Sequence, residues 1–408
     1  MLKLLGNPQE KVRVIHLAGT SGKGSTAYFI SSLLIVHGFK VGLHFKPHVF
    51  DIRERFQINN TLLSKEKTTL YADKVFEAIE KVKETQFGSP TYFETLVAIA
   101  YYAFFKENVD FAVIETGLGG LYDGTNIVKN PSKIAVITRL GIDHTAVLGK
   151  TKAEIAYQKA KIIHSKNTVI SLFQEPVQRR VIDAVAKEEK TSVLYVKKRT
   201  HYSLNKKESA HFSYHYRDLI LHNVYLNAPG AFQIENAALA LTVLQVLSKK
   251  YTFSLSQTAI VHMLGTIQIA GRYQRLTHKN INLVLDGAHN AQKMKAFLSG
   301  LSYDYPHKKF VFLVAFKKGK NSVSMMEQMS KYAKEIVITT FEPSKQDMYD
   351  FAQPPSLVLQ QTKQNKSVTL TVKETPKLAL QYVLTKKEIV VVTGSLYLVS
   401  QILSLLRL

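Results

Sequence analysis

Hydrophobic and polar positions alternate along this chain with two different periods. Short runs rich in β-branched residues, typical of buried strands, are separated by longer segments with apolar residues every three or four positions, typical of helices. The pattern predicts strands at Val12–Ala18, Val109–Glu115, Lys133–Thr138, Asn167–Phe173 and Thr191–Val196. It predicts helices at Lys23–His37, Thr68–Thr85, Thr91–Asn108, Lys152–His164 and Pro176–Lys187. This order indicates a doubly wound α/β domain with a parallel sheet.

The pattern changes after residue 200. Residues 201–204 and 212–216 predict short antiparallel strands, and Phe232–Leu247 predicts a strongly apolar helix. The strand–helix alternation then restarts, with strands expected at Ile281–Leu285, Phe310–Ala315, Glu335–Thr339 and Glu388–Val392. We therefore predict two domains, residues 1–272 and residues 273–408, the second a smaller Rossmann-like α/β domain.

Composition narrows the class of protein. The chain has 408 residues, of which 46% are hydrophobic and 21% charged, so it can bury sizeable cores. No apolar run approaches the length of a membrane span, and the segment Met1–Pro8 is too short for a signal peptide, so we expect a cytoplasmic protein. The absence of Cys excludes disulfides, thiolate nucleophiles and Cys-ligated zinc, which leaves oxygen or imidazole ligands for any metal.

The formal charge of +23 raises the question of nucleic-acid binding. The basic residues are spread along the chain, and the longest cluster, Lys197-Lys198-Arg199, is short. No recognition helix or RNA-binding signature accompanies them. A Lys-rich solvated surface is the favoured interpretation, so no nucleic-acid partner is expected, although the positive field would attract small anionic substrates.

A glycine-rich turn is the strongest chemical signal. The segment Gly19-Thr20-Ser21-Gly22-Lys23-Gly24-Ser25 lies between the strand Val12–Ala18 and the helix Lys23–His37. Backbone N–H groups and a helix N-terminus converge there, so the turn predicts phosphate binding, with Lys23 facing the β/γ-phosphates and Ser25 facing Mg²⁺. Gly24 separates the Lys from the hydroxyl, which disfavours an ordinary GTPase or helicase. The alternative is a glycine-rich turn without a ligand.

Polar residues also follow three other predicted strands. Glu115 is either a Mg²⁺ ligand or a capping or salt-bridged carboxylate, and the pair Asp143-His144 is either a metal site or structural. In the second domain, Asp286-Gly287-Ala288-His289-Asn290 is either a binding loop or an ordinary turn, and its position points to the cleft between the domains. The remaining histidines, including His201, His211, His215 and His222, are interpreted as surface or strand residues.

Together these residues resemble the folylpolyglutamate synthase/dihydrofolate synthase branch of the Mur ligases. The match begins near residue 6 and continues to the C-terminus. Its motifs are Gly6-Asn7-Pro8, Ala18–Thr26, Lys46-Pro47-His48-Val49, Arg53-Glu54-Arg55, Tyr92-Phe93-Glu94, Glu115–Gly120, Asp123-Gly124-Thr125-Asn126, Asp143-His144-Thr145, Leu148-Gly149, Gln158-Lys159-Ala160, Gln233, Asn236-Ala237-Ala238, Gly271-Arg272, Leu285–Asn290 and Thr393–Tyr397.

The resemblance implies a reaction and its cofactors, ATP and Mg²⁺. ATP would phosphorylate the γ-carboxylate of a folate, and the amine of L-glutamate would attack the acyl phosphate, which leaves an amide, ADP and phosphate. One Mg²⁺ would be held by Ser25, position 46 and Glu115, and a second by His144 and a carbamylated Lys159. Without the resemblance, Lys159 would be interpreted as an unmodified surface lysine.

The resemblance also implies roles for individual residues. The catalytic residues would be Lys23, His144 and Lys159. ATP would contact Gly19, Thr20, Ser21, Gly22, Lys23, Gly24, Ser25, Thr26, Asn236, Arg272, Asp286 and His289. The carboxylate substrate would contact Lys46, His48, Tyr92, Phe93, Glu94, Tyr122 and Asp123. We expect a monomer that binds neither membranes nor nucleic acid.

Three departures from the family pattern keep alternatives open. Lys46 stands where the family has a metal-ligating serine, the chain begins just before Gly6-Asn7-Pro8, and Leu121-Tyr122 replaces Arg-Leu. The last two concern the pterin side of the site. The hypotheses are a folylpolyglutamate-synthase-like ligase, a Mur-type ligase for another carboxylate such as a cell-wall peptide precursor, dihydrofolate synthase activity, and a nucleotide-binding protein without catalysis.

Overall fold

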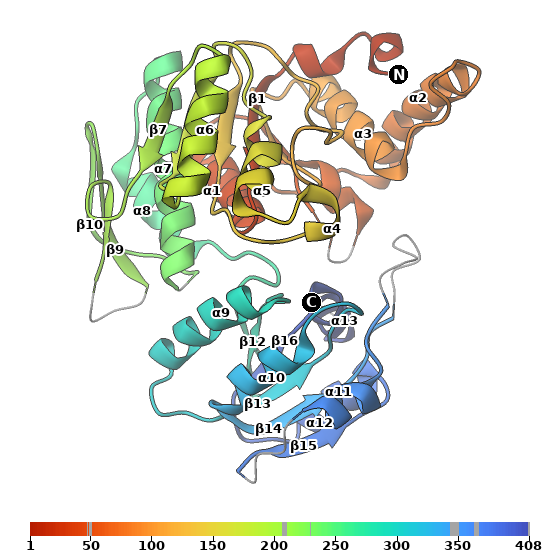
Figure 1. Ribbon diagram of the computed structural model, residues 1–408, viewed down its shortest axis with the longest axis vertical. Helices are drawn as coiled ribbons and strands as arrows, with labels where there is room; N and C mark the ends of the chain where they lie inside the picture. Colours follow the sequence, from red (N-terminus) through yellow and green to blue (C-terminus); the bar gives the residue numbers. More distant parts are fainter. Residues whose placement is uncertain are drawn as a thin grey trace. The chain divides into compact units, whose positions relative to one another are not determined.

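The computed structural model describes residues 1–46, 48, 51–205, 210–228, 230–342, 351–362 and 367–406. Pro47 and Val49 of the motif quoted above lie outside these residues. The chain forms two compact units, each with its own sheet (Figure 1). Unit 1 contains Met1–Leu204, Phe212–Tyr225 and Gln233–Gly265, and unit 2 contains Asn205–His211, Leu226–Phe232 and Thr266–Leu408.

Unit 1 is built on a seven-stranded sheet in the order β3-β2-β4-β1-β5-β6-β7. Its strands are β1 (Arg13–Ala18), β2 (Val41–His44), β3 (Gln57–Ile58), β4 (Phe111–Glu115), β5 (Ile134–Ile137), β6 (Thr168–Leu172) and β7 (Val193–Val196). Its helices are α1 (Lys23–Ile35), α2 (Lys65–Lys83), α3 (Tyr92–Lys106), α4 (Thr145–Leu148), α5 (Lys152–Ala160), α6 (Pro176–Glu188), α7 (Ala231–Tyr251) and α8 (Gln257–Thr266). All pairs in this sheet are parallel except β2–β3, which confirms the predicted doubly wound fold.

Three short antiparallel strands form a separate sheet in the order β10-β9-β8. They are β8 (Tyr202–Leu204), β9 (His211–Tyr216) and β10 (Leu219–Tyr225), where the sequence predicts a hairpin region. The long helix α7 follows them. Among the described residues, α7 is the one helix long and apolar enough to span a membrane, but 78% of its most apolar window is buried inside the protein, as is common for core helices.

Unit 2 has a six-stranded sheet in the order β11-β12-β16-β13-β14-β15. Its strands are β11 (Gln274–His278), β12 (Ile281–Leu285), β13 (Phe310–Val314), β14 (Ala333–Ile338), β15 (Thr369–Val372) and β16 (Val390–Thr393). Its helices are α9 (Ala291–Asp304), α10 (Ser322–Ser330), α11 (Pro355–Gln361), α12 (Pro376–Val383) and α13 (Leu396–Leu405). Only β11 runs antiparallel to its neighbour, so this unit is a second α/β layer structure as predicted.

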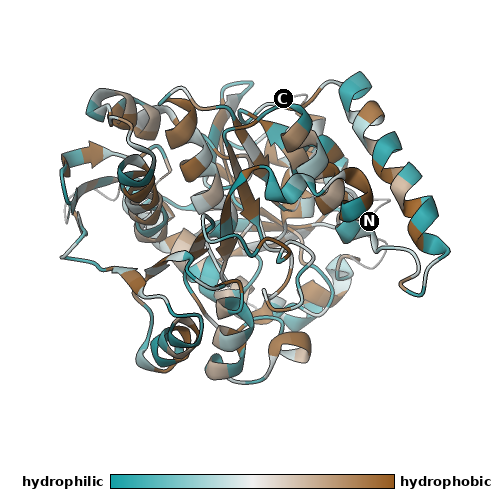
Figure 2. Ribbon diagram, turned by 90° about the horizontal axis from the view of Figure 1, so that it is seen from above, coloured by the Kyte–Doolittle hydropathy of each residue, from teal (hydrophilic) through white to brown (hydrophobic). Residues whose placement is uncertain are grey.

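The strands carry the hydrophobic cores. Figure 2 shows apolar residues concentrated on the central strands and polar residues along the outer faces of the helices. On one side of the unit 1 sheet, Val14 and Ile114 pack against α2 and α3. Another cluster joins Ala18 and Ile137 to α5 and α6. Burial of both sheet faces explains why these strands are continuous hydrophobic runs.

Several elements differ from the sequence expectation. The strands β2, β11 and β15 were not predicted, because they are short and carry no distinct period. Gly42 lies inside β2, where a Cβ would stand 2.5 Å from the ring of Phe104, so close packing rather than strand propensity requires this residue. The helix predicted to reach His164 ends at Ala160. Beyond this end, Lys161 O accepts from Asn126 Nδ2 at 3.0 Å and Ile162 O accepts from Lys133 Nζ at 2.8 Å, so these carbonyls bond to other segments and not to a further helical turn.

Lys133 is a buried cation just before β5. Its side chain is 0% exposed, and its Nζ donates to Val128 O at 2.7 Å and Ile162 O at 2.8 Å. Burial lowers the pKa of Lys133 from 10.5 to about 7, because removing the ammonium group from water disfavours its charged form. The lysine therefore joins the β4–β5 connection to the end of α5 through two backbone carbonyls.

The lowered pKa of Lys133 should make the folded protein more stable as the pH rises. The unfolded chain keeps the Lys133 proton up to about pH 10.5, whereas the folded protein releases it above about pH 7. Unfolding between these values takes up a proton, so the free energy of unfolding should increase by up to about 1.4 kcal/mol per pH unit. Urea unfolding of the Lys133→Met variant from pH 6.5 to 9 should show a smaller slope than the wild type. An unchanged slope would contradict the assignment, and Lys187→Met, an exposed helical lysine, is the control.

Candidate active site

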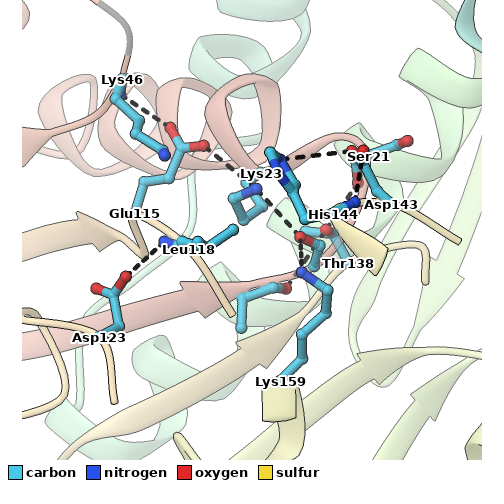
Figure 3. A network of polar contacts seen from close by, with 12 residues as sticks. Ser21, Lys23, Lys46, Glu115, Leu118, Asp123, Thr138, Asp143, His144 and Lys159 are labelled. Atoms are coloured by element: carbon cyan, nitrogen blue, oxygen red, sulfur yellow. Dashed lines mark hydrogen bonds and ion pairs between the residues drawn. The ribbon is translucent and has the colours of Figure 1, made fainter. Parts of the chain in front are cut away.

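The carboxyl ends of three neighbouring strands form the site in unit 1. The register places Leu17 of β1 beside Glu115 of β4, and Ala18 beside Ile137 of β5. The turn that begins at Gly19, the carboxylate of Glu115 and the segment that begins at Thr138 therefore emerge at one sheet edge. The sequence predicted this juxtaposition, and Figure 3 shows the resulting network.

The glycine-rich turn is held by the neighbouring strand connection. The N–H groups of Thr20 and Ser21 donate to Arg139 O at 2.9 and 3.1 Å, and Thr138 Oγ1 donates to Ser21 O at 2.7 Å. Gly22 has a φ of +87°, and a Cβ there would stand 2.2 Å from Asn236 Oδ1. Only glycine fits this position, so the side chain of Asn236 from α7 lies directly against the turn. The N-terminus of α1 follows, with its first N–H groups lacking partners within the helix.

Lys23 and Glu115 face each other across this turn. Lys23 Nζ lies 3.8 Å from Glu115 Oε1 and donates to Gly19 O at 3.1 Å. Glu115 Oε2 accepts from the backbone N–H of Lys46 at 3.2 Å. A Cβ on Gly24 would stand 3.3 Å from the same oxygen. The buried carboxylate thus lies against the first turn of α1, next to Ser25, which is also buried.

Two further lysines lie close to this pair. Lys159 Nζ donates to Gly19 O at 2.9 Å, and its side chain is buried. Burial, with repulsion from Lys23 next, lowers the pKa of Lys159 to about 7. Burial and repulsion from Lys23 also lower the pKa of Lys46 to about 8. The interpretation of Lys159 as a surface lysine is therefore wrong, because α5 directs it into the sheet edge beside the turn.

The loop after Glu115 is fixed by a buried polar chain. His16 Nε2 bonds to Thr125 Oγ1 at 2.8 Å, and Thr125 Oγ1 donates to Asp123 Oδ1 at 2.5 Å. Asp123 also accepts from the N–H groups of Leu118 and Thr125, so its carboxylate is occupied by the loop itself. Sequence reasoning missed His16 and gave Thr125 no role beyond its place in a family motif, since a histidine inside an apolar strand gives no sign of its distant partner.

Removing the Thr125 hydroxyl should destabilise unit 1. Thr125→Val keeps the shape but leaves the buried His16 Nε2 without a partner, so the free energy of unfolding should fall by about 1–3 kcal/mol. Thr125→Ser keeps the hydroxyl and should lose less than half of that amount. Urea unfolding of both variants measures the difference. Equal stability of the two variants would show that the hydroxyl does not hold the loop.

Other predicted residues have more varied surroundings. His144 follows β5 with positive φ, its side chain is 52% exposed, and its Nε2 lies 3.9 Å from Asp143 Oδ2. Glu94 caps α3 by accepting from the N–H of Thr91 at 2.7 Å, and His48 Nδ1 accepts from Arg55 Nε at 3.0 Å. Among the aromatic residues predicted to contact the substrate, Phe93 is partly buried, Tyr92 is exposed, and Tyr122 is 89% exposed. No group of three or more His, Asp or Glu residues that could hold a metal occurs within the described ranges.

Comparisons with known proteins decide the family. Residues 17–244 match the Mur ligase middle domain, and residues 268–405 match the C-terminal domain of dihydrofolate synthetase. The chain is 29% identical over 414 residues to a dihydrofolate synthase/folylpolyglutamate synthase of Bacillus subtilis, covering 98% of this chain and 92% of that protein. It belongs to the folylpolyglutamate synthase/dihydrofolate synthase family of the Mur ligases.

Solved structures agree with this family. A folylpolyglutamate synthase of Thermotoga maritima is 25% identical, with a TM-score of 0.85, and the match covers 100% of this chain and 91% of that one. An FPGS–AMPPCP complex is 26% identical, with a TM-score of 0.84, and covers 100% and 94% of the two chains. The predicted Mur-ligase-like fold is thus confirmed over both units.

Unit 2 of this Mur ligase brings together its own set of predicted residues. Asp286 follows β12, is buried, and accepts from the N–H groups of Tyr273 and Ala288 at 2.9 and 2.8 Å. Burial raises the pKa of Asp286 to about 6, although the positive charge of Arg272 opposes the shift. His289 Nδ1 bonds to Gly287 O at 2.7 Å, and burial holds the pKa of His289 well below its usual value.

Proposed function

We propose that this chain is an ATP-dependent ligase that joins the γ-carboxylate of a folate to L-glutamate through an acyl phosphate. The observation that carries the proposal is the Lys23–Glu115 pair at the glycine-rich turn, in a chain that matches both domains of the family. The AMPPCP complex of a related protein supports ATP as the nucleotide for this turn. The relative from Bacillus subtilis supports folate chemistry.

The chain's own groups explain how the phosphates would be held. Thr20 and Ser21 use their N–H groups to fix the turn, so the N–H groups at the start of α1 remain for the β-phosphate and γ-phosphate. Lys23 would neutralise charge on the transferring phosphoryl group, where preorganised positive charge contributes most to the rate. Asn236 would contact the nucleotide from α7, since its side chain lies against Gly22.

The donors near Lys23 fit one Mg²⁺. Mg²⁺ prefers oxygen ligands, and the buried carboxylate of Glu115 lies against the helix turn that carries the Ser25 hydroxyl. These two residues would hold the ion together with phosphate oxygens, and the ion would neutralise developing charge on the phosphates. Position 46 contributes a backbone N–H to Glu115 and not a ligand oxygen.

A second Mg²⁺ would involve His144 and Lys159. An ammonium cannot ligate a metal, but burial lowers the pKa of Lys159 to about 7, so a substantial share of the amine is neutral near neutral pH. The neutral amine can react with carbon dioxide to form a carbamate with release of a proton, which supplies the oxygen donors. Mass spectrometry of intact protein in bicarbonate under non-denaturing conditions tests this modification.

The folate would bind beside the loop that follows Glu115. Asp123 and Glu94 use their carboxylates within the protein, so we propose contacts mainly from Tyr92, Phe93 and Tyr122, with His48 and Lys46 as further contacts. Arg272, Asp286 and His289 in unit 2 are proposed to complete nucleotide binding. We further propose a monomeric cytoplasmic enzyme that binds neither nucleic acid nor membrane.

Substrate turnover tests the proposal. Purified protein with ATP and Mg²⁺ should release ADP only when both a tetrahydrofolate and L-glutamate are present. The panel should include cell-wall peptide precursors and other amino acids as alternative substrates. Absence of turnover with every folate would refute the proposed function, and turnover with a cell-wall precursor would replace it by another Mur-type activity.

Dihydrofolate synthase activity is the second candidate. It is favoured by the near full-length match to a protein named for both activities. Dihydropteroate in the same ADP-release measurement separates the two reactions, because it offers a benzoate-type carboxylate and lacks the γ-carboxylate of a folate.

A further inference from the structure

Lys46 is a partly buried cation that lies beside Glu115, in addition to its place among the proposed folate contacts. Its backbone N–H donates to Glu115 Oε2, and Figure 3 shows its side chain folding back towards the Glu115 carboxylate. The neighbouring residue Phe45 also lies close to the glycine-rich turn, since a Cβ on Gly24 would stand 4.0 Å from its ring. Lys46 is therefore anchored at the edge of the turn through its own backbone N–H, and the ring of its neighbour Phe45 lies against the same turn.

The charges around this turn are unevenly paired. Lys23, Lys46 and Lys159 are close enough to repel one another. Among the residues that the structure describes, Lys23 forms an ion pair with Glu115, and neither Lys46 nor Lys159 forms one. Glu115 and Asp123 both attract Lys46, but the Glu115 carboxylate already pairs with Lys23, and the Asp123 oxygens accept from Leu118 and Thr125. A partly buried ammonium without a direct carboxylate partner is costly unless a ligand supplies the negative charge.

We propose that the Lys46 ammonium binds the terminal phosphate of ATP beside Glu115 at the α1 N-terminus, so that a second lysine besides Lys23 neutralises the group to be transferred. This inference rests on the proposed function, because it assigns a new contact within the same nucleotide site. Its physical consequence is that the protein binds a nucleoside triphosphate well without a divalent cation. A lysine contacts phosphate as a point charge, so the contact needs no fixed geometry.

Nucleotide affinity measured without metal tests this contact. Isothermal titration calorimetry in EDTA should compare AMPPCP and ADP for the wild type, Lys46→Met and Lys46→Arg. Lys46→Met removes the charge with little change in length, and AMPPCP affinity should fall about tenfold to a hundredfold while ADP affinity changes less than about threefold. Lys46→Arg should retain the preference for AMPPCP. Added Mg²⁺ should strengthen AMPPCP binding more in Lys46→Met than in the wild type, since the ion then supplies the missing charge.

Controls separate this proposal from simpler explanations. Lys187→Met removes one charge from the exposed face of α6 and should leave both affinities unchanged. The thermal unfolding midpoint of Lys46→Met should not fall, because the substitution removes a poorly paired charge. Unchanged AMPPCP affinity in Lys46→Met, or equal losses for AMPPCP and ADP, would overturn the proposal. Failure of the wild type to bind either nucleotide would instead refute the proposed function.

Discussion

Replacing Lys23 with Ala should lower kcat/KM for the ligase reaction at least about a thousandfold. Lys23 is the lysine that combines an ion pair with Glu115 and a hydrogen bond to the turn at Gly19. Loss of one preorganised charge or donor at a reacting centre commonly lowers the rate a hundredfold to a thousandfold, and a phosphoryl group carries more charge than a carbonyl. Steady-state ADP release with saturating folate and glutamate measures the effect.

The control for this prediction is Lys187→Ala, which removes a lysine from an exposed helical face. Its kinetics should match those of the wild type. The stability of Lys23→Ala should change by less than about 1 kcal/mol, because the lost ion pair is long, its loss relieves repulsion with Lys46 and Lys159, and Lys46 still attracts the Glu115 carboxylate. Near-normal turnover in Lys23→Ala would show that ATP binds elsewhere.

Replacing Glu115 with Gln should separate metal binding from nucleotide binding. The amide keeps the size of the carboxylate but loses its charge, so it ligates Mg²⁺ poorly. Turnover should fall about a hundredfold or more. In EDTA, however, AMPPCP should bind as tightly as to the wild type or more tightly, because a negative charge beside the phosphates has been removed.

The decisive measurement for Glu115 is the Mg²⁺ dependence of AMPPCP affinity. Mg²⁺ should strengthen binding in the wild type and have little effect in Glu115→Gln. If the variant retains the full response to Mg²⁺, Glu115 is not a metal ligand and only pairs with Lys23. Glu175→Gln, at an exposed carboxylate before α6, provides the matched control.

Some positions in the site were accessible to sequence reasoning, and others were not. The turn and Glu115 stand at the ends of strands with a strong hydrophobic pattern, and parallel strands bring their carboxyl ends to one edge of the unit 1 sheet. Asp286 stands at the end of such a strand in the separate sheet of unit 2. Lys159 and Lys133 carry no such mark, because a lysine in a helix or before a strand is ordinarily solvated. Lys159 is held by the carbonyl oxygen of Gly19, and Lys133 by that of Ile162 as well as that of the nearby Val128; Gly19 and Ile162 are far from these lysines in sequence.

The sequence by itself determined the parallel α/β units and the glycine-rich turn of this Mur ligase. It could do so because hydrophobic period and glycine spacing act locally, through strand and helix formation and through backbone conformation. Only the tertiary structure decided how the charges are paired. It places Lys159 and Lys46 beside the Lys23–Glu115 pair. It also uses the Asp123 carboxylate to accept a hydrogen bond from Thr125, which is in turn bonded to His16. Charge pairing and burial are set by residues far apart in sequence, so no local pattern records them.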